Sequence, residues 1–164
     1  MRPSSLATAA ILAVTAIWGS TFFVIKDAVG KVDPVDFLVV RFAIGAAIPS
    51  LLFLGRLRRL TARQWLVGLG IGVVYGLAQI AQTVGLQTTA ASVSGFITGT
   101  YVVLTPVVMW VAFRARATAG TWAAIALATV GLGVLSLTGF GPGAPLLGVG
   151  ESLTLLGAAL YAVH

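Results

Sequence analysis

A run of apolar residues from Leu6 to Ile25 contains no charged side chain and lies between Arg2 and Lys26. As a helix that rises about 1.5 Å per residue, roughly 20 residues match the roughly 30 Å hydrocarbon layer of a bilayer. The run is longer than a signal-peptide core of about 7 to 15 residues, and no convincing cleavage site precedes Lys26. We therefore expect an uncleaved membrane-spanning helix.

The composition agrees with a membrane protein. Apolar residues make up 59% of the chain and charged residues 9%, whereas a soluble domain carries about 25% charged residues. The net charge of +6 comes from short basic clusters between apolar runs, which argues for the cytoplasmic bias of Lys and Arg and against nucleic-acid binding. The chain has no cysteine, which excludes disulfides and thiol chemistry, and we expect no metal and no cofactor.

Further apolar runs follow the first, separated by helix-breaking or charged links. Asp33 and Pro34 end one helix and start the next, and Thr61 is a candidate helix cap. Pro106 is expected to kink the fourth span. The additional spans are predicted at about Phe37–Leu54, Trp65–Gly85, Ala90–Phe113 and Thr121–Leu137. The predicted fold class is all-α, a polytopic bundle of transmembrane helices.

The distribution of basic residues predicts an orientation. Arg2, the cluster from Arg56 to Arg63, and Arg114 with Arg116 fall on one side of the predicted membrane, and only Lys26 and Lys31 fall on the other. Because cytoplasmic loops carry the excess of Lys and Arg, the N-terminus is expected in the cytoplasm of a multi-pass cell-membrane protein.

The final stretch begins a sixth apolar segment. We expect a five-span unit over residues 6–138, a Gly/Pro-rich loop over 139–150, and the truncated start of a second unit over 151–164. Ala159–Ala162 aligns with Ala16–Gly19, with Tyr161 over Trp18. If this is a repeat, five spans per unit force the second unit to enter the membrane from the opposite side, which makes an inverted repeat. The alternative is a partial span that a partner supports, as in a homodimer.

Several short motifs, in this order and spacing, resemble the EamA family of the drug/metabolite transporter superfamily. The residues that carry the resemblance are Trp18, Gly19, Ser20, Lys26, Pro34, Arg41, Ala91, Ser92, Pro106, Val107, Gly131, Gly133 and Gly148–Ala162. The resemblance implies half of a ten-span carrier, built from two inverted five-span units, that exports or imports amino acids and other metabolites.

Two predicted spans carry polar side chains at helical spacing. In each span these residues fall on one face of the helix and form a polar stripe. A turn of only a few residues joins the two spans, so the two polar stripes are expected to face each other. They form either the lining of a substrate path or hydrogen bonds that hold the helices together. The residues are Tyr75, Gln79 and Gln82 in the third span and Ser94, Thr98, Tyr101 and Thr105 in the fourth.

Arg41 lies inside the second span, where a guanidinium is costly and usually paired. It either snorkels and pairs with Asp33 or Asp36, or recognises an anionic group of a substrate. Trp18 either packs in the core or forms a wall of the substrate cavity.

Closely spaced glycines suggest helix packing. The steps Gly68, Gly72 and Gly76, and Gly95 with Gly99, follow the G-x-x-x-G pattern that lets backbones approach.

We therefore predict a transporter of small metabolites that works by alternating access around a cavity between the third and fourth spans. The substrate-path candidates are Trp18, Arg41, Tyr75, Gln79, Gln82, Ser94, Thr98 and Tyr101. A non-catalytic membrane scaffold is the alternative. An intramembrane enzyme is disfavoured, because the spans hold no paired acids and no serine with an internal histidine.

Overall fold

The computed structural model describes residues 3–114, 118–139 and 148–164, and every described element is a helix. The predicted Gly/Pro-rich loop falls mostly on residues 140–147, outside the described residues. The helices are α1 (Pro3–Val29), α2 (Pro34–Leu52), α3 (Leu54–Leu57), α4 (Ala62–Gly85), α5 (Ala91–Gly99), α6 (Tyr101–Phe113), α7 (Ala119–Gly139) and α8 (Val149–Val163).

Four segments are long and apolar enough to cross a bilayer: Ser5–Val29, Pro34–Leu52, Ala62–Gly85 and Ala91–Ala112. The shorter α8 is also apolar. The polytopic helical fold predicted from the sequence is therefore confirmed, and the protein is a multi-pass membrane protein.

Local signals set the predicted helix starts. Asp33 caps α2, its side chain accepting a hydrogen bond from the Val35 backbone N–H at 2.8 Å, and Pro34 follows as the first helical residue. Thr61 and Gln64 form a reciprocal capping box at the start of α4. Both starts lie where the sequence predicts them.

The fourth predicted span is interrupted at Thr100, between α5 and α6, and α6 continues through Pro106. Thr100 bonds to the Ile97 carbonyl through both its backbone N–H, at 3.1 Å, and its hydroxyl, at 2.6 Å, which tightens the turn to a three-residue step. The break is therefore a three-residue backbone turn that follows Gly99. A bend at Pro106 itself stays a prediction.

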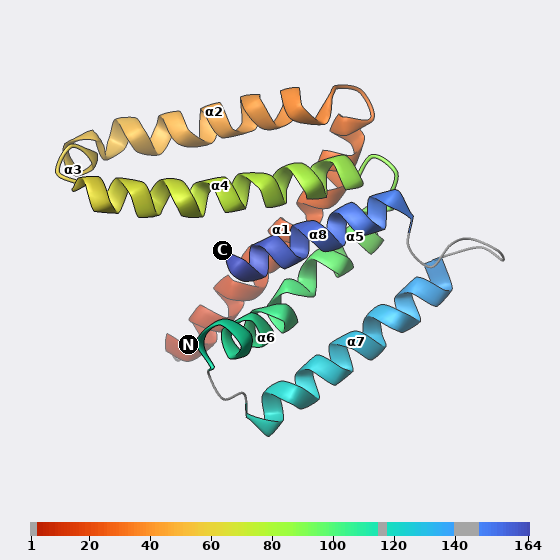
Figure 1. The fold of residues 1–164 in the computed structure, drawn as a ribbon. Coiled ribbons are helices and arrows are strands. Elements are labelled where there is room, and N and C mark those ends of the chain that lie inside the picture. Colours follow the sequence, from red (N-terminus) through yellow and green to blue (C-terminus); the bar gives the residue numbers. More distant parts are fainter. Residues whose placement is uncertain (1–2, 115–117, 140–147) are drawn as a thin grey trace.

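The helices form a bundle in which α8 occupies a central place (Figure 1). It lies beside α4 and also contacts α5 and α6, while α2 lies on the other side of α4 and α7 against α5 and α6. The chain direction of α8 is opposite to that of α1. This is the direction that the inverted-repeat prediction requires.

The core sits between α4 and α8, where small residues let the backbones approach. Ala78 and Ala158 are fully buried. A Cβ added at Gly157 would lie 3.0 Å from the Ala78 carbonyl oxygen, and one added at Gly85 would lie 2.6 Å from the carbonyl oxygen of Gly150. Only glycine allows this separation of the two helices.

The sequence predicts that the G-x-x-x-G glycines of α4 pack against another helix, and this prediction is wrong among the described residues. A Cβ at Gly68, Gly72 or Gly76 would meet no described atom within 4 Å. Those glycines lie on a face of α4 that no described helix covers. Gly95 does pack, because a Cβ added there would lie 3.6 Å from the Phe22 ring, whereas Gly99 has open space.

Candidate functional site

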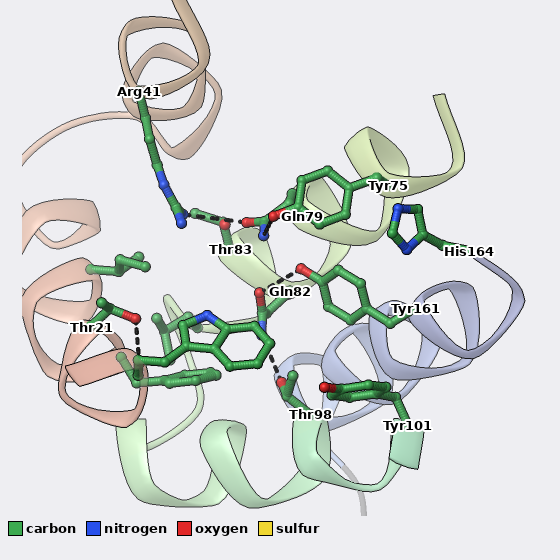
Figure 2. Close-up of a pocket in the computed structure, with 14 residues that line it drawn as sticks. Thr21, Arg41, Tyr75, Gln79, Gln82, Thr83, Thr98, Tyr101, Tyr161 and His164 are labelled. Carbon is green, nitrogen blue, oxygen red and sulfur yellow. Dashed lines mark hydrogen bonds between the residues drawn. The ribbon is translucent and has the colours of Figure 1, made fainter. Parts of the chain in front are cut away.

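A cavity of about 180 Å³ opens among α1, α2, α4, α5, α6 and α8 (Figure 2). Its lining combines aromatic, apolar and hydrogen-bonding side chains. The lining residues are Trp18, Thr21, Phe22, Ile25, Arg41, Tyr75, Gln79, Gln82, Thr83, Leu86, Thr98, Tyr101, Tyr161 and His164.

The cavity lies deep along the helix axes. Arg41 is seven residues after the start of α2 and Tyr161 is twelve after the start of α8. At about 1.5 Å per residue, these positions lie roughly 10 Å and roughly 18 Å from the helix ends. The second distance is about half of a roughly 30 Å hydrocarbon layer, so the cavity lies well away from the helix ends.

Gln82 of α4 links three helices across the cavity. Its side-chain nitrogen donates to the Thr98 hydroxyl of α5 at 2.7 Å, and its side-chain oxygen accepts from the Tyr161 hydroxyl of α8 at 2.9 Å. Figure 2 shows the three side chains converging from their separate helices. The two predicted polar stripes therefore meet at Gln82 and Thr98.

Arg41 reaches into the cavity from α2 and does not pair with the nearby acids. Its guanidinium donates to the Gln79 side-chain oxygen at 3.4 Å, and Gln79 in turn donates to the Tyr75 hydroxyl at 3.0 Å. Asp33 is occupied as the α2 cap. The local ion pair that was one of the two interpretations of Arg41 is therefore not formed among the described residues.

Aromatic rings form the opposite side of the cavity. The Tyr161 ring lies 5.8 Å from the Tyr75 ring and 6.1 Å from the Tyr101 ring, centroid to centroid. His164 lies 5.2 Å from Tyr75. These distances are those of favourable tilted and edge-to-face ring pairs, so the tyrosines form one connected wall.

At one end of the bundle, Lys26 of α1 forms hydrogen bonds to the turn between α4 and α5. Its ammonium donates to the backbone carbonyls of Leu86 and Gln87, at 2.7 Å and 2.9 Å. These carbonyls lie in the turn after α4, where a helix C-terminus leaves acceptors unpaired and attracts positive charge. Lys26 therefore holds α1 against the α4–α5 turn.

All the predicted site residues except Ser94 line the cavity. Ser94 is fully buried elsewhere, with its hydroxyl oxygen 3.5 Å from that of Thr154 in α8. Its polarity serves the contact between α5 and α8, which corresponds to the interhelical interpretation of the polar stripe.

Sequence reasoning missed the contribution of α8 to the cavity. Tyr161 and His164 both line it, and neither is among the candidates that the sequence pattern indicates. The alignment of Tyr161 with Trp18, which also lines the cavity, was the available signal. Thr83 lies one position from the predicted stripe and is 2% exposed.

Comparisons with known proteins agree with this architecture. Residues 5–137 match the EamA-like transporter family. The chain is 42% identical over 101 residues to an uncharacterized transporter of Archaeoglobus fulgidus. The match covers 62% of this chain and 30% of that relative, so it spans less than a third of the relative's length. No solved structure matches the chain.

Proposed function

Because the chain belongs to the EamA-like transporter family, we propose that the whole protein carries small metabolites, such as amino acids, across the cell membrane by alternating access. The cavity is the proposed substrate site. Trp18 and Tyr101 are its proposed aromatic walls, and Gln79 and Gln82 its proposed hydrogen-bonding groups.

The observation that carries this proposal is a cavity with polar side chains between helices that are apolar enough to cross a membrane. Polar side chains in a hydrocarbon layer are expensive unless they have partners, and those in transmembrane segments commonly mark substrate paths. Gln79 and Gln82 are 5% and 8% exposed and take part in hydrogen bonds, yet both keep contact with the open cavity. A solute with hydrogen-bonding groups finds both partners and apolar surface there.

The proposed mechanism needs a second set of helices. We propose a second five-span unit in the same chain, or a homodimer partner, packed so that the cavity lies between the two units. The opposite directions of α1 and α8 support an inverted arrangement. The two units would rock about the cavity and expose it to each side in turn.

The proposed orientation places the N-terminus in the cytoplasm, from the distribution of basic residues. The end tied by Lys26 then faces outward. Opening toward that side would require α1 to separate from the α4–α5 turn and break both Lys26 hydrogen bonds.

Flux through reconstituted vesicles tests the proposal. The full-length protein is placed in vesicles and assayed with a radiolabelled mixture of amino acids and small carboxylic acids. We expect saturable uptake that Thr98→Val reduces strongly, because this variant removes the Gln82 partner inside the cavity. The matched control is Thr129→Val on the exposed side of α7, where the hydroxyl donates to the Ile125 carbonyl of its own helix.

The two outcomes separate the hypotheses. Uptake that falls with Thr98→Val and not with Thr129→Val, with both variants eluting as folded protein, supports the transporter. Absence of flux for every solute, together with a stoichiometric co-purifying partner, would instead support the scaffold.

A further inference from the structure

We propose that the cavity selects a small carboxylate of net charge −1 with an apolar, ring-sized body. The carboxylate binds Arg41 and the body lies against the tyrosine wall formed by Tyr75, Tyr101 and Tyr161. This inference rests on the proposed function and specifies its substrate class.

The first argument is the state of Arg41. A guanidinium carries five N–H donors and stays charged, and its planar fork matches a carboxylate. Among the described residues it makes one long hydrogen bond, at 3.4 Å, to the neutral Gln79. A cation two turns inside a membrane helix with so few contacts retains most of its capacity to bind an anion.

The second argument is the charge of the surroundings. No described residue that lines the cavity is an Asp or Glu. Of the nearby acids, Asp27 pairs with Lys31 at 2.7 Å, Asp33 caps α2, and Asp36 is exposed and does not line the cavity. The described lining therefore offers a positive group for an anion and no carboxylate for an ammonium, which favours a ligand with net charge −1 over a zwitterion.

The third argument is the shape of the opposite side. In Figure 2, Arg41 enters from one side while Tyr161 and Tyr101 lie on the other, with Gln82 between them. The three tyrosine rings give a broad apolar surface with hydroxyl groups at its edge. A cavity of about 150 Å³ is enough to hold benzene, so the 180 Å³ here accommodates one ring.

Three compounds with one carbon skeleton test the charge selection. Isothermal titration of the full-length protein in detergent is carried out with phenylpropionate, its amide phenylpropionamide, and phenylalanine, which adds an ammonium group. We expect phenylpropionate to bind at least about tenfold more tightly than the amide, the factor expected when one charge-assisted hydrogen-bonded pair is lost. Phenylalanine should bind more weakly than phenylpropionate.

Variants of Arg41 assign the effect to this side chain. Arg41→Gln should abolish the preference for the acid over the amide while the amide binds as before. Arg41→Lys should keep part of the preference, because it keeps the charge and loses the fork. Arg56→Gln is the matched control, since Arg56 lies in α3 over the Phe53 ring and outside the cavity.

Three results would overturn the inference. These are equal binding of acid and amide, tighter binding of phenylalanine, and no saturable binding of any of the three at millimolar concentrations. If Arg41→Gln does not fold, the ratio of the affinities of the unmodified protein for phenylpropionate and phenylpropionamide still tests the inference. Binding does not require transport, so selective binding without flux would refute the proposed transport while leaving the carboxylate selectivity of the cavity in place.

Discussion

Helix α1 is more apolar than α4, but it is less buried within the chain. The most apolar window of Ser5–Val29 has a mean hydropathy of 1.9, and none of it is buried within the chain. In α4 the value is 1.5, and 28% of the window is buried. The less apolar of these two helices is therefore the more buried one.

The difference follows from the solvent. Lipid tails are as apolar as leucine, so apolar side chains bring a helix into the bilayer without choosing its neighbours. Small residues that allow close approach, and hydroxyl or amide groups that bond across helices, make that choice. Helix α4 supplies both kinds on its α8 side, in Ala78, Gln82 and Gly85.

The largest expected effect compares two glycines. Gly157→Val should destabilise the protein by about 1 to 3 kcal/mol, the usual cost of overpacking, because the new side chain meets the Ala78 carbonyl and the Gln82 backbone nitrogen. Gly72→Val, on the uncovered face of α4, is the control and should change little. Thermal unfolding of the full-length protein in detergent measures both. Equal losses would remove the contrast between the two faces of α4.

The next effect compares two lysines at the same end of the bundle. Lys26→Met should cost about 1.5 kcal/mol, because it removes a charged donor from two backbone carbonyls. Lys31→Met breaks an exposed ion pair with Asp27 and should be close to neutral. The unfolding temperatures of the two variants provide the measurement. If Lys31→Met were the more damaging, the tie between α1 and the α4–α5 turn would not be the stabilising contact.

The smallest expected effect is the coupling between α4 and α5. A double-mutant cycle of Gln82→Leu and Thr98→Val should give a coupling energy of about 0.6 kcal/mol and not above about 1.7 kcal/mol, the range of hydrogen bonds between membrane helices. The unfolding free energies of the two single variants and the double variant supply the cycle. A coupling energy near zero would mean that the 2.7 Å hydrogen bond between Gln82 and Thr98 does not stabilise the protein.

The sequence predicted the helices well because apolar runs and caps are local signals. Thr61 and Asp33 act on N–H groups two or three residues away, so their roles follow from spacing alone. The contact between the two polar stripes was also predictable, since only a short turn joins α4 and α5. Gln82 and Thr98 meet as that argument requires.

The rest depended on contacts far apart in sequence. Tyr161 meets Gln82 across 79 positions, and no local pattern shows which face of α4 receives α8. The glycines were misjudged for the same reason, because helix contacts are not visible in local spacing. The regularly spaced Gly68, Gly72 and Gly76 lie on the uncovered face of α4. The close approach of α4 and α8 instead involves Gly85 and Gly157, one on each helix. The sequence offered only nearby acids as partners for Arg41, because its contact, Gln79, lies on another helix.

The late position of α8 in the chain has a consequence for biosynthesis. Between the end of α4 at Gly85 and the end of α8 at Val163, the ribosome must add 78 residues, which takes about 4 to 16 s at about 5 to 20 residues per second. During that interval the amide of Gln82 lacks its Tyr161 partner. A nascent chain halted before α8 therefore keeps the Gln82 bond to Thr98 but leaves the Gln82 side-chain oxygen without its Tyr161 donor.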